Sequence, residues 1–172
     1  MTEFYKKLRL DSYNLEIPLL QSKRNIQDLL QKHGIQMEIP MDDLIIIKSR
    51  ILSLDMNFYI SFRFKHESLI AVSMSPEGYL EGRRLHDRYR KIQKVLKDVL
   101  GRPGNIVQML YNYLNPDGSS FYWVDDGVRI THVLQERFGM EEIITFNLSK
   151  GKFIQPMRIL NEICWWIGGV GA

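Results

Sequence analysis

A seven-residue stretch in the first half of the chain, FYISFRF (58–64), alternates strictly between apolar and polar side chains. Successive side chains of a β-strand point to opposite faces, so this alternation predicts a strand with one face in the core and the other in water. The residues on the covered face are Phe58, Ile60, Phe62 and Phe64. A strand of this kind needs neighbouring strands and a second layer packed on its phenylalanine face.

Similar signals flank this strand. The segment IQMEI (35–39) alternates apolar with polar residues and predicts a half-buried strand, closed by turn-forming residues at 40–43. The segment LIIIKSRIL (44–52) begins apolar on both faces, as a central strand does, and LIAVSM (69–74) follows a short turn. We therefore expect an antiparallel meander of up to four strands over residues 35–74.

Two helices are predicted on either side of this meander. Ser22 is a favourable N-cap for a helix over 22–33. A longer helix is predicted over 80–102, with Gly101 and Pro103 as its C-terminal stop signals, and it carries one continuous apolar stripe. The stripe consists of Leu85, Tyr89, Ile92, Leu96 and Val99.

The second half of the chain predicts more strands. The stretch FYWVDDGVRITHVLQ (121–135) indicates a hairpin, because Asp126-Gly127 is a favoured pair in tight turns. Its second strand should place one set of side chains on a shared face, namely Val128, Ile130, His132 and Leu134. The stretch EEIITFNL (141–148) adds a further strand.

Three segments are less specific. Residues 1–21 are expected to form a short helix or an irregular arm, because Pro18 breaks any early helix. The segment 106–114 fits a short helix and a strand equally. Apolar spacing from Pro156 to Ile167 predicts a last helix, followed by a flexible tail over 168–172.

Together these elements predict an α+β fold. We expect all 172 residues to form a single globular domain, with one antiparallel sheet of about five to seven strands and helices packed on one face. The element order is helix, three or four strands, helix, two or three strands, helix. Over 22–167 this order resembles that of the bacterial type III secretion chaperones and their structural relatives. The resemblance is one of topology, so it implies a fold and no function.

Composition restricts the class of protein. A hydrophobic fraction of 45% with 25% charged residues is typical of soluble globular chains. The single cysteine, Cys164, excludes an internal disulfide, and the N-terminus has no apolar run of signal-peptide length. The apolar-rich run over 153–172 is interrupted by Arg158 and Glu162, so no membrane span is predicted. We expect a bacterial, cytoplasmic protein.

The chain lacks the familiar motifs of catalysis and metal binding. It has no His-Glu-x-x-His helix, no nucleophile elbow, no Cys pair at metal spacing and no phosphate-binding loop. The acidic pairs fall in predicted turns, at Asp42-Asp43, Asp125-Asp126 and Glu141-Glu142. We predict no catalytic residue, no metal and no cofactor.

An alternative is a small enzyme in which His132, near Asp125 or Asp126, acts as a base. Otherwise His132 is a core histidine bonded to the backbone.

Positive charge is concentrated in the predicted helix over 80–102. Eight basic and three acidic residues give this stretch an excess of five positive charges, although the whole chain carries only +3. At about 100° per residue, Arg84, Lys91 and Asp98 lie opposite the apolar stripe. The basic side is then the solvated back of a core helix, a surface for an acidic protein, or a surface for nucleic acid.

Trp165 and Trp166 suggest a second contact point. Adjacent helical residues lie about 100° apart, so if Trp166 faces the core, Trp165 lies at the edge. There it packs within the monomer or anchors a partner or a second copy of the chain.

The leading hypothesis is a non-catalytic protein-binding module, either a chaperone-like or an immunity-like adaptor. Its partner is an acidic protein, or the chain self-associates as a dimer. The nucleic-acid-binding helix is the alternative, and the enzyme near His132 is the second alternative. The proposed contact residues are Arg83, Arg84, Arg88, Lys91 and Trp165.

Overall fold

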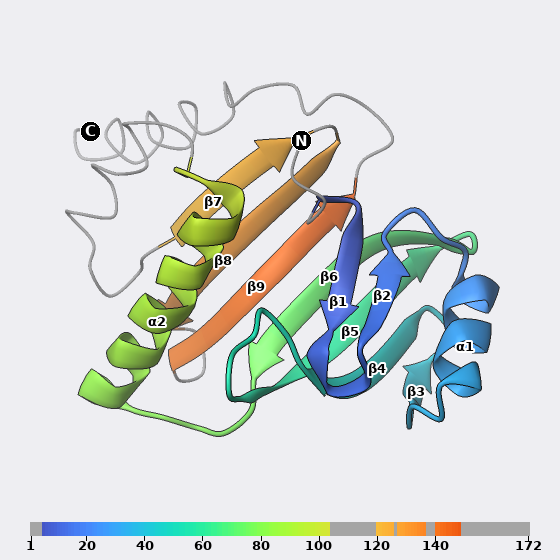
Figure 1. Cartoon of the computed structure of the whole chain (residues 1–172), viewed down its shortest axis with the longest axis horizontal. Coiled ribbons are helices and arrows are strands. Elements are labelled where there is room, and N and C mark those ends of the chain that lie inside the picture. The colour runs from blue at the N-terminus through green and yellow to red at the C-terminus, as the bar shows by residue number, and fades with distance from the viewer. Residues whose placement is uncertain (1–4, 104–119, 126, 137–139, 149–172) are drawn as a thin grey trace, which may run out of the picture.

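The computed structural model describes residues 5–103, 120–125, 127–136 and 140–148, and it shows an α+β fold built on an antiparallel sheet of seven strands (Figure 1). The strand order across the sheet is β3-β4-β5-β6-β9-β8-β7. The strands are β3 (Glu38–Met41), β4 (Leu44–Arg50), β5 (Asn57–Lys65), β6 (Ser68–Pro76), β7 (Ser120–Asp125), β8 (Val128–Glu136) and β9 (Met140–Leu148). The predicted fold class is confirmed.

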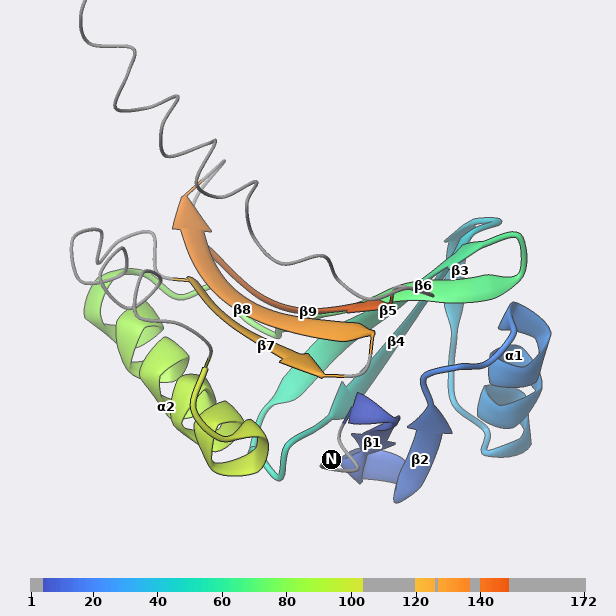
Figure 2. The ribbon, with the colours of Figure 1, turned by 90° about the horizontal axis from the view of Figure 1, so that it is seen from above.

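The remaining elements all lie on one face of the sheet (Figure 2). They are the helices α1 (Lys23–Lys32) and α2 (Gly82–Leu100), and a hairpin of β1 (Lys7–Leu10), the 3-10 turn η2 (Asp11–Tyr13) and β2 (Leu15–Pro18). Helix α2 covers the half of the sheet formed by β7, β8 and β9, and the hairpin covers strands of the other half (Figure 1). The hydrophobic core fills the layer between them.

The alternating strand β5 has the predicted orientation. Phe58, Ile60 and Phe62 are fully buried, whereas Tyr59 and Arg63 are exposed. The core-facing side of β8 is also as predicted, with its four residues buried: Val128, Ile130, His132 and Leu134. Both strands thus confirm that period-two alternation identified the core face.

Both predicted helices that fall within the described residues are confirmed. Ser22 caps α1, because its Oγ accepts a hydrogen bond from the backbone N–H of Asn25 at 3.2 Å. Helix α2 ends at Gly101, which has a φ of 80°. The stripe of α2 faces the sheet, with Leu85, Tyr89, Ile92 and Leu96 buried and Val99 partly covered.

The expectation for residues 35–39 was wrong. The strand begins at Glu38 and runs through Pro40, and all four of its residues are exposed. Strand β3 lies at the edge of the sheet, where proline is tolerated because one side of the strand has no hydrogen-bonding partner. Ile35 is buried outside the strand, and Ile39 is 48% exposed, so the alternation at 35–39 did not mark a core-facing strand.

Residues 5–21 are neither an arm nor a helix. Strands β1 and β2 pair antiparallel, from Lys7↔Pro18 to Leu10↔Leu15. The residues of this segment that enter the main core are Tyr5, Leu8, Leu10, Leu15, Ile17 and Leu19. Pro18 ends a strand rather than interrupting a helix. The hairpin therefore replaces the expected arm as a part of the second layer.

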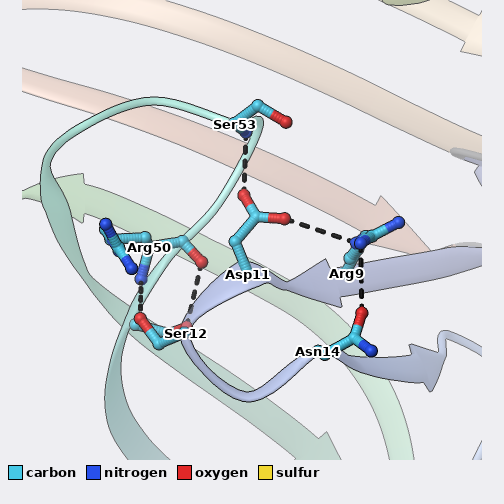
Figure 3. Close-up of polar contacts among 7 residues, drawn as sticks. Arg9, Asp11, Ser12, Asn14, Arg50 and Ser53 are labelled. Atoms are coloured by element: carbon cyan, nitrogen blue, oxygen red, sulfur yellow. Dashed lines mark hydrogen bonds and ion pairs between the residues drawn. The ribbon is translucent and has the colours of Figure 1, made fainter.

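The tip of this hairpin is attached to the loop between β4 and β5 (Figure 3). The Asp11 carboxylate accepts a hydrogen bond from the backbone N–H of Ser53 at 2.8 Å, and Ser12 Oγ accepts one from the backbone N–H of Arg50 at 2.9 Å. Leu52 and Ser53 have φ values of 58° and 54°, a conformation costly for residues other than glycine. The bond from Asp11 helps to hold the loop in this conformation.

Three predicted features lie outside the described residues: the segment 106–114, the helix from Pro156 and the tail over 168–172. The expectation of a single domain stays a prediction. No helix in the part of the chain that the structure describes is long and apolar enough to cross a membrane.

Candidate functional site

The solvent side of α2 forms a positively charged surface. Six basic residues of this helix are exposed, and we call them the α2 basic surface: Arg83, Arg84, Arg90, Lys91, Lys94 and Lys97. Two acidic residues, Asp87 and Asp98, are exposed on the same helix, which leaves an excess of four positive charges. Ion pairs of Asp87 with Arg83 and Arg90, at 4.0 Å and 3.9 Å, are exposed and therefore weak.

An open pocket lies where this helix begins. It is lined by Tyr79, Leu80, Glu81, Arg83 and Arg84. Tyr79 is 71% exposed, and its hydroxyl donates a hydrogen bond to Glu81 at 2.9 Å. Tyrosine and arginine are among the residues enriched at the energetic centres of protein interfaces.

The predicted contact residues lie in different environments in the structure. Arg83, Arg84 and Lys91 are exposed on α2, as expected for contact residues. Arg88 points towards the sheet instead: its Nε donates to Glu142 at 2.9 Å, and its Nη1 donates to the carbonyl of Gly78 at 2.8 Å. Its side chain is only 11% exposed, so Arg88 holds α2 in place inside the protein. Trp165 lies outside the described residues.

Below the helix, Arg88 belongs to a buried polar network with Gln93, His132 and Glu142. Glu142 Oε1 lies 3.0 Å from His132 Nε2, and Gln93 Oε1 lies 2.6 Å from His132 Nδ1. The side chains of His132 and Glu142 are completely buried. The network joins α2 to β8 and β9, and within it the positive charge of Arg88 lies against the negative charge of Glu142.

The two oxygens around the imidazole restrict its protonation. Both ring nitrogens face an oxygen, whereas neutral histidine donates from one nitrogen only. Either the ring carries two protons, or Gln93 turns its amide so that its nitrogen donates to Nδ1. The second arrangement also provides a partner for Gln93 Nε2, which has no hydrogen bond to any described residue. Burial lowers the pKa of His132 against the opposing effect of Glu142, and this favours the neutral ring.

Tyr89 of α2 covers the imidazole of His132 within this network. Its ring stacks on the imidazole of His132, with ring centroids 4.3 Å apart. Burial, with a smaller contribution from the charge of Glu142, raises the pKa of Tyr89 far above its usual value of 10.0. The phenol therefore stays protonated and acts as a packing group.

The surroundings of His132 do not support the alternative in which it acts as a base near Asp125, and Asp126 lies outside the described residues. His132 is fully buried, and it does not line the pocket at the start of α2. Asp125 pairs with Val128, while His132 pairs with Phe121, so four residues or about 13 Å of strand separate Asp125 from the histidine. We therefore propose no reaction at His132. The described part of the chain also holds no group of three or more metal-ligating side chains.

Gln93 and Glu142 were not predicted as site residues. Glu142 was predicted both in the strand over 141–148 and, as part of an acidic pair, in a turn. It lies in the strand, β9, where it alternates with the buried residues Ile144 and Phe146. That alternation was the signal that it faces the core. Gln93 follows Tyr89 by one helical turn and lies next to Ile92 in the apolar stripe, so its burial was also readable from the spacing.

Comparison with known proteins finds no matching family model, no matching curated protein and no matching solved structure. The resemblance of the element order to that of the type III secretion chaperones stays a prediction.

The buried histidine leads to a prediction about pH. In the unfolded chain His132 takes up a proton near its usual pKa of 6.5, whereas in the folded protein it does so only at lower pH. The free energy of unfolding should therefore fall as the pH decreases below about 6.5, by up to about 1.4 kcal/mol per pH unit. Urea unfolding between about pH 5 and pH 8 measures this slope. A His132→Gln variant should show a shallower slope, and equal slopes would contradict the assignment.

Proposed function

We propose that this protein is a non-catalytic, protein-binding module of the bacterial cytoplasm, an adaptor of the chaperone or immunity type. Its contact surface is the α2 basic surface together with the pocket at the start of α2, and its partner presents acidic side chains. The observation that carries this proposal is the excess of four positive charges on the exposed side of one helix. Such a surface attracts an acidic protein and orients it on approach.

The rigid attachment of α2 supports this role. Tyr89, Ile92 and Leu96 are buried, and Arg88 is hydrogen-bonded to β9 and to the loop before the helix. The exposed cations therefore start from a fixed backbone, which reduces the entropy lost on binding.

An acidic protein fits α2 better than nucleic acid does. Asp87 and Asp98 interrupt the α2 basic surface, and they would repel a phosphate backbone lying along the helix. The aromatic residue of this helix, Tyr89, is buried against His132 and cannot stack on a base.

A double charge reversal tests this proposal. We expect Arg84→Glu combined with Lys91→Glu to weaken binding of the natural partner by about tenfold or more, mainly by slowing association. Arg24→Glu combined with Lys32→Glu is the matched control, because it makes the same change in charge on exposed residues of α1. Partners captured by the wild type are identified by mass spectrometry, and their association rates are measured at two salt concentrations.

Three results would contradict the proposal. In the first, the α2 variant and the α1 control keep the same partners at the same rates. In the second, the wild type binds random duplex or single-stranded DNA and the α2 reversal abolishes that binding, which supports nucleic acid on α2. In the third, the chain forms a dimer that the α2 reversal dissociates.

A further inference from the structure

The face of the sheet opposite the helices is free of described helices and hairpins (Figure 2). Its side chains are mostly polar, and the register aligns several of them in a row perpendicular to the strands. This hydroxyl row crosses β7, β8, β9, β6 and β5, and its members are Tyr122, Thr131, Thr145, Ser73 and Ser61. The row offers hydroxyl groups as hydrogen-bond donors and acceptors across most of the sheet.

A second row lies beside it and has an arginine at each end. Arg129 on β8 pairs with Asn147 on β9, Asn147 pairs with Ala71 on β6, and Ala71 pairs with Arg63 on β5. Ala71, which has a short side chain, and Asn147 lie between the two arginines in this row. The two arginines therefore lie beside the hydroxyl row, one near each end of it.

The described side chains of this open face carry a positive net charge. On strands β4 to β9, the outward positions whose side chains are described hold no aspartate or glutamate, and they hold five cations: Lys48, Arg50, Arg63, Lys65 and Arg129. Glu77, just beyond β6, pairs with Lys48, and Asp55 lies 3.7 Å from Arg50. These acids lie at the margin, so the face keeps a positive excess.

Two tyrosines stand on this face, each in contact with a cation. Tyr59 on β5 is 48% exposed, and Lys48 Nζ lies 5.9 Å from its ring centroid. Tyr122 on β7 has Arg129 Cζ 5.6 Å from its ring centroid. Four inter-strand steps separate β5 from β7, which corresponds to about 19 Å. The hydroxyl row between these two strands is therefore long enough for several nucleotides.

We propose that this open face binds single-stranded nucleic acid. The bases stack on Tyr59 and Tyr122, the phosphates lie near Arg63 and Arg129, and the hydroxyl row supplies hydrogen bonds without selecting a sequence. A duplex fits less well, because its bases are already stacked and expose no faces to the tyrosines. The proposal is independent of the protein-binding surface, since α2 lies on the other side of the sheet (Figure 2).

Other occupants match the face less well. Residues 150–172 of this chain contain Lys150, Lys152 and Arg158 but a single acid, Glu162, so their charge has the same sign as the face. An acidic polypeptide matches the charge but offers no bases for the tyrosines. Nucleic acid combines both properties.

Fluorescence anisotropy with a labelled oligo-dT of about 16 nucleotides tests the proposal on the full chain. The wild type should bind at low salt and release the strand as salt increases. We expect Tyr59→Ala to weaken binding by roughly tenfold, and Tyr59→Phe to retain it because the ring still stacks. Arg63→Glu should weaken binding and lower the salt dependence by about one unit of log–log slope.

Matched controls come from other surfaces. Tyr79→Ala removes an exposed tyrosine near α2, and Arg24→Glu reverses a charge on α1; both should bind oligo-dT like the wild type. The proposal is overturned if the wild type binds no oligo-dT at low salt, or if these controls lose as much affinity as the sheet variants. It is also overturned if poly-glutamate displaces oligo-dT with equal affinity, or if Tyr59→Ala dissociates a dimer of the chain.

Discussion

Replacing Glu142 by leucine should lower the free energy of unfolding by about 3–5 kcal/mol. Glu142 is completely buried, and its two carboxylate oxygens contact Arg88 Nε at 2.9 Å and His132 Nε2 at 3.0 Å. Without it, a guanidinium with a side chain only 11% exposed and a buried imidazole both lose their acceptor. Urea unfolding at neutral pH measures the loss.

An exposed ion pair provides the matched control. Glu16 pairs with Lys7 Nζ at 2.9 Å, but both side chains are more than 40% exposed. Glu16→Leu should therefore change the free energy of unfolding by less than about 1 kcal/mol. Adding Arg88→Leu to Glu142→Leu should restore part of the lost stability, because the unpaired buried charge is then gone. Equal losses for Glu142→Leu and Glu16→Leu would show that the network contributes nothing beyond surface pairing.

Long periodic segments made most of the fold predictable. Strand β5 alternates over nine residues, and the apolar stripe of α2 extends over four turns. Periodic patterns of this length rarely arise by chance, so both elements could be predicted. Strands β1 and β2 have four residues each, and so each provides only two inward positions. A pattern that short does not distinguish a strand from an irregular arm, and the pairing that identifies it is a tertiary contact.

The candidate sites were also predictable only where a local pattern determines the position of a side chain. Helical spacing correctly placed Arg84 and Lys91 on the solvent side of α2, because position around a helix depends on sequence alone. Arg88 lies at the border of that stripe, and its long side chain can reach water or the sheet. The orientation of this side chain depends on Glu142, its hydrogen-bond acceptor, which lies 54 residues later in the sequence. Alternation in β9 placed Glu142 in the core, but no local pattern identified its partner.

The open face of the sheet was also partly readable. The pattern of β5 predicted that Tyr59, Ser61 and Arg63 point to water. Their alignment with Thr145 and Thr131 required the strand order, in which β6 pairs with β9 rather than with β7. A sequence gives the face of each strand, whereas the composition of a whole sheet face follows from the order and register of its strands.

Leu10→Ala is the sharpest test of the hairpin, which stands where a short helix or an irregular arm was predicted. Leu10 is fully buried in the main core, so the truncation removes apolar contacts and leaves a cavity, which should cost about 2–5 kcal/mol in the free energy of unfolding. Leu20→Ala, ten residues later, makes the same chemical change at a leucine that is 83% exposed, and it should cost less than about 0.5 kcal/mol. Urea unfolding of the two variants beside the wild type gives both values. If residues 5–21 were an arm, neither variant would be destabilised. A large loss for Leu10→Ala alone requires that the hairpin unfolds together with the sheet that it covers.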